Sequence, residues 1–342
     1  MATIRDIAGA CGVSPSVVSY VINNSRPVAP KTRKKILHAM HEMSYHPSAL
    51  ARGLSRKKMN LIGVIFSRIF STPLTNPFFG PILDGIVSTG MDRQQSTAFF
   101  TWPTWEEIDA HHTVYCDGRV DGLILIAPNT DSPIISTLKR RGIPFVVVAQ
   151  TVEQEGITCI DIDNVGAARQ AIDHLLALGH RRIAMVSGDS WAAGMQARTN
   201  GFRQAISNAG IHFDEDLMCE GSCSLRTVSD NVAQLLSLPA SKRPTAIFFG
   251  NDELALKGIT QIEEHGFRVP KDISVIGFDD IAAAASSNPP LTTIRQPLNL
   301  YGQTAVTSLL DQMNHGLASG IPCDDVKAEF VVRQSTGRVA EA

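Results

Sequence analysis

The N-terminal stretch TIRDIAGACGVSPSVVSYVIN, residues 3–23, decides how the chain begins to fold. Thr3 can cap a helix over residues 4–10, and Asp6 would lie favourably in its first turn. Gly12 can then adopt the positive φ of a tight turn, which other residues resist. The sequence therefore predicts a short helix that ends in a sharp corner.

A second helix is predicted directly after this corner. Ser14 is a favourable N-cap and a proline follows at the first helical position, so this helix would cover residues 15–22. Ala8, Gly12 and Val18 have the spacing of a helix-turn-helix, in which a small residue lets the helices approach, a glycine makes the corner and an aliphatic residue fills the wedge. A third, basic helix is predicted from Lys31 to Met43, with its inner face formed by Ile36, Ala39, Met40 and Met43.

The charge of the chain is divided unevenly between two regions. Residues 1–60 hold ten Lys and Arg against two acidic residues, a formal charge of +8, whereas the other 21 basic and 31 acidic residues give −10. Such asymmetry favours a basic module that contacts a polyanion and an acidic body that does not. A three-helix module could also bind a protein, so the DNA interpretation depends on the motif and the charge together.

In the DNA interpretation, the start of the second helix enters the major groove. Its outward-facing candidates for base contacts are Pro15, Ser16, Ser19 and Tyr20. The basic residues at the start of the third helix would contact phosphates, which position a protein without reading the sequence. These residues are Lys31, Arg33, Lys34 and Lys35.

Two further stretches complete a resemblance to a known family. VAPKTRKKIL (28–37) and YHPSALARGLSR (45–56), together with residues 3–23, resemble the LacI/GalR repressors, and the purine repressor subgroup in particular, and the resemblance continues to the C-terminus. It implies a homodimer that binds double-stranded DNA at a pseudo-palindromic operator and is switched by a small-molecule effector. Ligand-induced release and ligand-promoted binding share this architecture, so the sequence leaves both open.

The resemblance also implies that residues 47–54 form a hinge helix whose Leu54 wedges into a base step through the minor groove. So short a segment, weakened by Gly53, cannot hold a helix alone and would order only against DNA and its partner's copy. Leu54 could instead pack on the core as part of a linker. The candidate DNA contacts are then Thr3, Pro15, Ser16, Ser19, Tyr20, Asn23, Arg26, Thr32 and Leu54.

After Lys58 the pattern changes to alternating strands and helices, in two successive series. This alternation predicts an α/β body with parallel sheets and helices on both faces. The expected architecture is a three-helix headpiece (1–46), a hinge helix and linker (47–59), and a two-lobed domain like the periplasmic binding proteins (60–342). The resemblance implies that the chain crosses between the lobes more than once, with lobe 1 near 60–162 and 295–323 and lobe 2 near 163–294 and 324–342.

The predicted elements of the body follow in order. Strands are expected at 61–66, 97–101, 122–126, 145–149, 159–162, 183–186, 217–219, 246–250, 275–278 and 328–332, and helices at 79–94, 106–116, 133–141, 165–178, 196–209, 225–236, 253–265 and after Pro297. Ligands of such sheets collect outside the carboxyl ends of the strands, here between the two lobes.

Polar residues near these strand ends are the candidate effector ligands. Arg198 lies where the family has its effector-contacting arginine, and Asn251 and Asp279 would bind hydroxyls or ring nitrogens of the ligand. The several N–H donors of the Arg198 guanidinium, the Asn251 amide and the acceptor carboxylate of Asp279 suit a polyhydroxylated molecule. Each residue could instead be a helix cap or a surface charge, and Asp252 and Asp280 are predicted to be the better caps. The pair Asp163–Asn164 is predicted to cap a helix at a crossover.

The first lobe offers Phe78, Phe79 and Gln150 as further effector contacts. Either phenylalanine could stack on a ring of the ligand or simply fill the core. Gln150 and Cys223 replace the aromatic residues expected of a purine repressor, and the region 67–76 is longer. These departures argue against a purine and for a sugar or sugar derivative.

Other classes of protein are disfavoured by the sequence. No stretch is long and apolar enough to span a membrane, and the N-terminus has no secretory signal, so a cytoplasmic protein is expected, not a periplasmic solute-binding protein. Nucleotide-binding and hydrolase motifs are absent, and neither a cofactor nor a metal ion is expected. The six cysteines (Cys11, Cys116, Cys159, Cys219, Cys223 and Cys323) are predicted to be reduced thiols. No heptad repeat follows Arg338, which favours a dimer over a tetramer.

Overall fold

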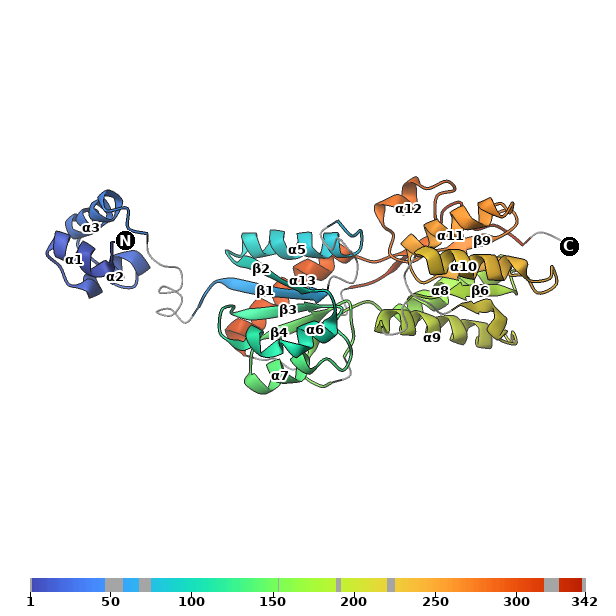
Figure 1. Cartoon of the computed structure of the whole chain (residues 1–342), viewed down its shortest axis with the longest axis horizontal. Coiled ribbons are helices and arrows are strands. Elements are labelled where there is room, and N and C mark those ends of the chain that lie inside the picture. The colour runs from blue at the N-terminus through green and yellow to red at the C-terminus, as the bar shows by residue number, and fades with distance from the viewer. Residues whose placement is uncertain are drawn as a thin grey trace. The chain divides into compact units, whose positions relative to one another are not determined.

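A computed structural model describes residues 2–46, 58–67, 75–152, 154–188, 192–219, 225–316 and 326–339. The chain forms two compact units, residues 1–61 with 119–121, and residues 62–118 with 122–342. Figure 1 shows their elements.

The first unit contains the predicted helix-turn-helix. It consists of α1 (Ile4–Cys11), α2 (Pro15–Asn23) and α3 (Pro30–Glu42). Thr3 and Asp6 form a capping box at the start of α1, and Gly12 ends this helix with a φ of 64°. The small core is made of Ile7, Ala8, Cys11, Val18, Val21 and Ile36. Ala8 and Val18 therefore lie in the core between the helices and Gly12 makes the corner, as predicted.

The inner face of α3 is shorter than predicted. Ile36 is buried, and Ala39 and Met40 pack partly against the core. Met43, which was assigned to this face, is 37% exposed because α3 ends at Glu42 and Met43 already lies in the C-cap.

The first sheet of the second unit has the strand order β2-β1-β3-β4-β5. Its strands are β1 (Leu61–Ser67), β2 (Ser96–Trp102), β3 (Gly122–Ile126), β4 (Phe145–Val148) and β5 (Thr158–Ile160), and the pairs β1–β3, β3–β4 and β4–β5 are parallel. Helices α5 (Phe79–Asp92) and α13 (Leu298–His315) cover one face, while α6 (Trp105–Ala110) and α7 (Pro133–Arg141) lie on the other (Figure 1).

Helices α5 and α13 pack with almost no space between their backbones. A Cβ at Gly85 would lie 2.2 Å from the carbonyl oxygen of Asn299, and one at Gly302 would lie 2.2 Å from that of Ile82. Only glycine permits this approach, so the late helix α13 is fixed in the first lobe although it follows the whole second sheet in sequence.

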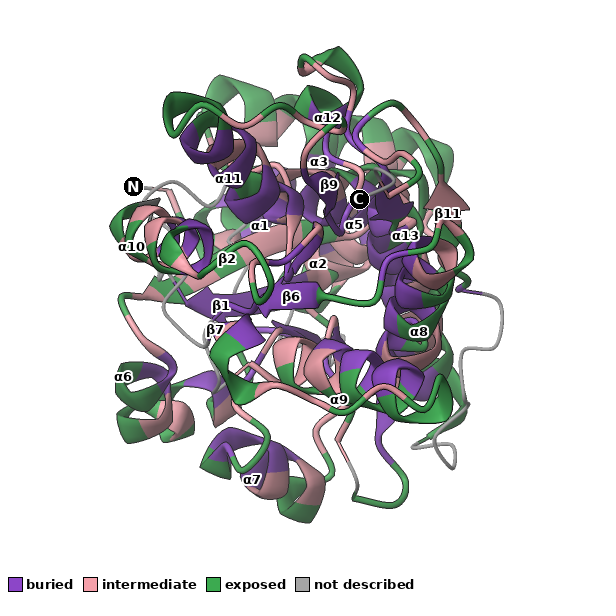
Figure 2. Ribbon diagram, turned by 90° about the vertical axis from the view of Figure 1, so that its right-hand side faces the viewer, coloured by how far each residue is buried: buried purple, intermediate pink, exposed green. Residues whose placement is uncertain are grey.

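The second sheet is entirely parallel, with the order β7-β6-β8-β9. Its strands are β6 (Ile183–Val186), β7 (Met218–Cys219), β8 (Ala246–Phe249) and β9 (Ser274–Ile276). Helices α8 (Asn164–Ala177) and α9 (Ala193–Asn208) share one apolar cluster with it, and α10 (Leu225–Ser237), α11 (Asp252–Glu264) and α12 (Ala282–Ser286) surround the other face. The central strands of both sheets, such as β1 and β6, are buried, whereas the edge strand β2 and the outer helix faces are more exposed (Figure 2).

The chain crosses between the lobes at three places. It leaves the first sheet after β5, returns through β10 (Thr293–Arg295) into α13, and comes back as β11 (Glu329–Val331), which pairs antiparallel with β10. The following segment is tied to the second sheet, since Val275 N donates to the carbonyl of Ser335. The predicted α/β fold class, with a helix-turn-helix region and a two-sheet body, is confirmed.

One predicted helix is wrong in kind. Residues 106–116 form α6 and a separate 3₁₀ helix, η1 (His112–Cys116). The rings of His111 and His112 contact the carbonyl oxygens of Glu107 and Asp109, which competes with continuation of the α-helical hydrogen bonds. The other predicted strands and helices of the two series lie within three residues of the observed ends.

Candidate functional site

The exposed start of α2 is the candidate DNA-reading surface. Pro15 and Ser16 are exposed, while Ser19 and Asn23 are half-buried and joined by a hydrogen bond from Asn23 Nδ2 to Ser19 Oγ of 3.1 Å. One turn of helix therefore presents a small hydroxyl at Ser16 and a paired polar group behind it. Hydroxyl and amide groups of this kind can bond to base edges in the major groove.

The other candidate DNA contacts surround this turn. The guanidinium of Arg26 lies 5.0 Å from the centre of the half-buried Tyr20 ring, so the two side chains support each other. Thr3 is exposed, but its hydroxyl is already used in the capping box of α1. Thr32 is half-buried in the first turn of α3.

Two of the four basic residues of α3 have partners within the headpiece. Lys31 and Lys34 are exposed. Arg33 donates to Asn24 Oδ1 at 3.2 Å, and Lys35 Nζ donates to the carbonyl of Cys11 at 3.0 Å. Lys35 thus neutralises the C-terminus of α1, a role that the charge count did not reveal. The predicted hinge, with Leu54, lies outside the described residues.

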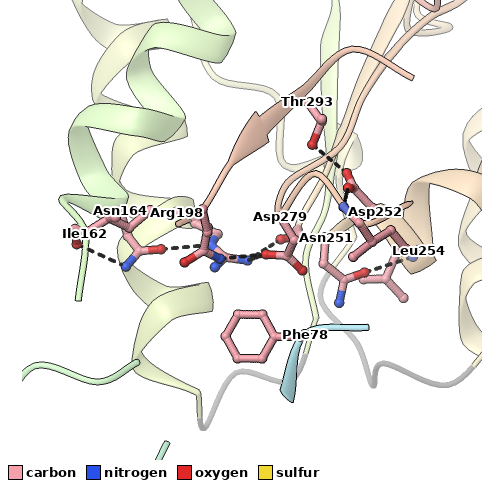
Figure 3. Close-up of polar contacts among 12 residues, drawn as sticks. Phe78, Ile162, Asn164, Arg198, Asn251, Asp252, Leu254, Asp279 and Thr293 are labelled. Carbon is pink, nitrogen blue, oxygen red and sulfur yellow. Dashed lines mark hydrogen bonds and ion pairs between the residues drawn. The ribbon is translucent and has the colours of Figure 1, made fainter. Parts of the chain in front are cut away.

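Arg198, on α9, is the centre of a buried polar cluster at the second sheet (Figure 3). Its Nε donates to Asn164 Oδ1 at 3.0 Å, and its Nη1 donates to the carbonyl of Gly250 at 2.6 Å. Nη1 also lies 3.7 Å from Asp279 Oδ1, and the guanidinium carbon lies 3.7 Å from the centre of the Phe278 ring. The arginine is therefore held flat between an aromatic face and fixed acceptors.

Asp279 follows β9 in an unusual backbone conformation. Its φ is 120° and that of Asp280 is 57°, so two consecutive non-glycine residues adopt positive φ. Backbone strain of this kind persists only where surrounding contacts impose it, and it is concentrated at binding sites. Burial is the main cause that raises the pKa of Asp279 to about 7, and the nearby Arg198 opposes this shift.

A cavity of about 640 Å³ lies beside Asp279. It is lined by the start of α5 and the residues before it (75–77, 80 and 81), by residues 279–282, and by the crossover 295–300. Both lobes thus contribute to its wall. Of the six predicted effector residues, all of which the structure describes, only Asp279 lines it. The segments 68–74, 189–191 and 220–224, which follow β1, β6 and β7, lie outside the described residues, Cys223 among them.

The helix cap predicted for Asp252 is formed by Asn251, and Asp252 and Asp280 have other partners. Asn251 is the N-cap of α11, with its Oδ1 accepting from Leu254 N at 2.9 Å (Figure 3). Asp252, predicted to be the cap, is fully buried and accepts from the hydroxyl of Thr293 and the backbone N–H of Ile281. Asp252 and Asp280 were predicted to cap because helix starts favour aspartate, but each instead has a long-range partner.

The partners of Asp280 are two arginines. Its carboxylate oxygens lie 2.7 Å from Arg295 Nε and 2.6 Å from Arg333 Nη2. Since Arg295 lies in β10 and Arg333 follows β11, this carboxylate ties the second sheet to the antiparallel pair of strands at the crossover.

The first lobe contributes uncharged side chains near its strand ends. Phe79 is 6% exposed and belongs to the core, whereas Phe78 is half-buried and meets it edge to face. Gln150, two residues after β4, is 3% exposed, and its Nε2 donates to Thr130 Oγ1 at 3.0 Å and to the carbonyl of Thr151 at 3.2 Å. Phe79 therefore fills the core, whereas part of the Phe78 ring remains accessible.

The sequence analysis did not identify a set of buried polar residues that connects to Arg198 through Asn164. Asn164, the first residue of α8, donates to both carboxylate oxygens of Asp161 at 3.2 Å. The hydroxyl of Tyr301 lies 3.3 Å from Asp161 Oδ1 and 2.8 Å from Gln296 Oε1. Asp161 directly follows β5, so the strand-end rule that selected Asp279 could have found it, whereas the sequence held no signal for Tyr301.

Burial is again the main cause that raises the pKa of Asp161 to about 6, and the same cause raises that of Asp252 to about 6. Asp163 caps α8 as predicted, accepting from Gly166 N at 2.8 Å. The guanidinium of Arg198 thus acts on two carboxyls, Asp279 and Asp161, that burial makes reluctant to ionise.

The described residues hold no group of three or more His, Cys, Asp or Glu side chains arranged to bind a metal ion. Cys11, Cys116, Cys159 and Cys219 are unpaired thiols, as predicted, and the other two cysteines lie outside the described ranges. No helix in the described part of the chain has both the length and the apolar character to cross a membrane. The cluster around Arg198 offers hydrogen-bond donors, an amide and carboxylates, a set suited to an uncharged polar ligand.

Comparisons with known proteins agree with this division of the chain. Residues 3–48 match the family described as bacterial regulatory proteins, lacI family, and residues 172–336 match the periplasmic binding protein-like domain. The chain is 35% identical over 316 residues to the HTH-type transcriptional repressor PurR of Aliivibrio fischeri (strain MJ11), with 92% of each chain covered.

Two solved structures are similar over nearly the whole chain. One is the lac repressor dimer bound to operator and the anti-inducer ONPF, with a TM-score of 0.85, 29% identity, and 98% of this chain and 99% of that chain covered. The other is a complex of the transcriptional regulator CelR with cellobiose, with a TM-score of 0.73, 27% identity, and coverage of 98% and 100%. These relatives are transcriptional regulators and not enzymes.

Proposed function

We propose that a sugar or sugar derivative binds between the two lobes of this chain and changes its affinity for the operator. The chain belongs to the lacI family of bacterial regulatory proteins. As a member of this family the chain is a DNA-binding transcriptional repressor that forms a homodimer and responds to a small-molecule effector. The identity of the effector and the residues that hold it are the proposal.

The observation that carries the proposal is the buried pair of Arg198 and Asp279, 3.7 Å apart at the carboxyl end of the second sheet. A cavity wide enough for a small molecule begins at Asp279. A sugar presents several hydroxyls that both donate and accept, which matches a guanidinium, a carboxylate and the Asn251 amide. Cellobiose in the related CelR complex supports the same class of ligand.

The remaining contacts are proposed from both lobes. Phe78 offers an apolar face for the ring of the sugar, and Gln150 offers an amide from the first lobe. Phe79 is not proposed as a direct contact because its ring is part of the apolar core, whereas Gln150, although also buried, carries a polar amide.

The proposed switch connects this cleft to DNA. Ligand that contacts both lobes favours one angle between them, which in a dimer changes the spacing of the two hinge segments. The segments 47–54 then order on the operator, with Leu54 in the minor groove, or fail to do so. The proposed major-groove contacts are Pro15, Ser16, Ser19 and Tyr20, with half-sites about one helical turn apart.

The test is the thermal unfolding of the chain against sugars, sugar phosphates, nucleobases and nucleosides. A ligand at 100 times its Kd adds about 2.7 kcal/mol to the stability of the protein that binds it. We expect a sugar to raise the unfolding midpoint of the wild-type chain and of Asp272→Ala, a surface control whose carboxylate pairs with Arg268. Asp279→Ala should lose the shift.

The outcomes separate the two parts of the proposal. A nucleobase that stabilises the chain, with loss of the effect in Asp279→Ala, would keep the site and reject the sugar. A sugar that stabilises wild type and Asp279→Ala equally would reject the site.

A further inference from the structure

Asp161 and Asp279, carboxyls on different elements, are linked by a continuous chain of polar contacts. Gln296 Nε2 donates to Asp279 Oδ1 at 2.6 Å. The hydroxyl of Tyr301 donates to Gln296 Oε1 at 2.8 Å, and the same hydroxyl oxygen lies 3.3 Å from Asp161 Oδ1. Asp161 and Gln296 lie at crossovers between the lobes, Asp279 belongs to the second lobe and Tyr301 to α13 of the first.

The number of protons in this chain can be counted. Each of the three contacts needs one hydrogen atom. The Gln296 amide supplies a hydrogen to one contact, whichever way the amide is oriented, and the Tyr301 hydroxyl supplies a hydrogen to a second. Burial raises the pKa of Tyr301, so its hydroxyl keeps its proton. The third contact is therefore complete only when one of the two carboxyls is protonated.

The position of that proton follows from the neighbours of each carboxyl. Asp279 lies beside the guanidinium of Arg198, which favours its ionised form, although Asp252 and Glu253 on α11 oppose this. Asp161 forms no ion pair with Arg198, although the guanidinium also favours its ionised form, and it accepts from neutral donors, the N–H of Ile162 at 2.9 Å and the amide of Asn164. Burial raises the pKa of both carboxyls, but only Asp279 forms an ion pair with the guanidinium, so the proton is assigned to Asp161, where it reaches the Tyr301 oxygen.

The same arrangement balances the buried charge. With both carboxyls ionised, one guanidinium would face two negative charges away from water, which is costly. With one proton on Asp161, Arg198 and Asp279 form a neutral pair.

We infer that Asp161, Tyr301 and Gln296 are positioning residues of the effector site, which hold one proton between the two carboxyls and thereby present Asp279 to the cleft as an ionised acceptor. This inference rests on the proposed function only in treating Asp279 as an effector ligand. It narrows the effector to one that donates a hydrogen bond to Asp279, such as a hydroxyl, since an acceptor atom would first have to draw the proton across the chain.

The experiment uses the full chain without any effector, so a failed ligand search leaves its result intact. Unfolding midpoints in urea are measured from pH 4 to pH 8 for wild type, Asp161→Asn and Asp163→Asn. The Asp161→Asn amide can donate to Tyr301 permanently and cannot ionise. Asp163→Asn is the matched control, two residues away, because asparagine is an equally good N-cap.

The sign of the expected effect follows from the raised pKa of Asp161. Its protonated form stabilises the wild type below about pH 4, where an unfolded aspartate is protonated, and this stabilisation is lost as the pH rises to about 6. Relative to Asp161→Asn, the wild-type unfolding constant should rise about 100-fold over this range and stay level above it. Asp163→Asn should parallel the wild type.

Parallel profiles for wild type and Asp161→Asn would overturn the inference, because Asp161 would then be ionised throughout. If Asp161→Asn does not fold, the infrared carbonyl band of protonated carboxyls decides, compared at pH 5 between wild type and Tyr301→Phe. A proton donated by Asp161 to Tyr301 predicts a band that shifts when the hydroxyl is removed, and an unchanged band would reject it.

Discussion

The two lobes share a parallel sheet flanked by helices, yet their strand ends differ in chemistry. The second lobe gathers charged side chains at the carboxyl ends of its strands, where Arg198 of α9 and Asp279 are held by fixed partners and Asp252 is buried. The first lobe offers neutral groups, the half-buried ring of Phe78 and the amide of Gln150, and its carboxyl Asp161, directly after β5, lies at the crossover to the second lobe. In the proposed function the two similar scaffolds would divide one task, with the fixed charges recognising a polar ligand and the neutral groups covering it.

The difference also concerns stability. A charged group that is buried and hydrogen-bonded is expensive to leave without its partner, whereas a neutral amide in the same position costs much less. The second lobe should accordingly depend on its strand-end side chains for folding as well as for binding, and the first lobe should not.

Arg198→Met is expected to have the largest effect. It would remove the ion-pair partner of Asp279 and the donor to the Gly250 carbonyl and Asn164 Oδ1, all in a buried site. Breaking a buried ion pair costs about 3–5 kcal/mol, so urea unfolding should show a loss of this size together with the loss of effector binding.

The control for this change lies on the same helix. Arg203 is half-exposed and pairs with Glu215 at 3.9 Å, a surface contact worth less than about 1 kcal/mol. Arg203→Met should unfold nearly like the wild type and keep its effector response. Equal losses in the two variants would mean that the cluster around Arg198 has no special role in stability.

Gln150→Leu tests the first lobe and should cost less. Leucine fills similar space, but Thr130 and the carbonyl of Thr151 lose a donor, which is worth about 1–2 kcal/mol for neutral groups. Gln312→Leu is the matched control, because Gln312 is also buried in this lobe and donates to a threonine, Thr158, at 3.0 Å.

Both glutamine variants should lose similar stability in urea, and only Gln150→Leu should weaken effector binding. If Gln150→Leu destabilised the protein as much as Arg198→Met, the two lobes would not differ in the way described. If both variants bound effector equally well, Gln150 would be a structural residue alone.

The sequence predicted the scaffold better than the site because the two depend on different information. Helix caps, glycine corners and alternating strands are local patterns, so the helix-turn-helix and both sheets could be derived from neighbours in the chain. The roles of Asn251 and Asp252 could not, because the buried partner of Asp252 is Thr293, 41 residues away.

Tyr301 illustrates the same limit. Its side chain reaches Asp161, 140 residues earlier, only because Gly85 and Gly302 let α13 pack closely on α5. A lone tyrosine in an amphipathic helix carries no sign of such a partner, and neither glycine stands out in the sequence.

The smallest effect on stability is expected at Asn251, where the cap and the proposed ligand contact can be separated. Its Oδ1 caps α11 by accepting from Leu254 N, and its Nδ2 supplies the donors that a sugar would need. Asn251→Asp keeps a good cap next to the positive end of the helix dipole, so the free energy of unfolding should change by less than about 0.5 kcal/mol. It adds a carboxylate and removes both amide donors, so effector binding should be lost.

Asn251→Ala completes this test, because it removes the cap and the donors together. It should lower the free energy of unfolding by about 1 kcal/mol and abolish the effector response as well. Thermal unfolding with and without the stabilising sugar measures both quantities for the two variants. An Asn251→Asp variant that responds to effector like the wild type would show that Asn251 only caps α11. The proposed effector contacts of the second lobe would then be Arg198 and Asp279.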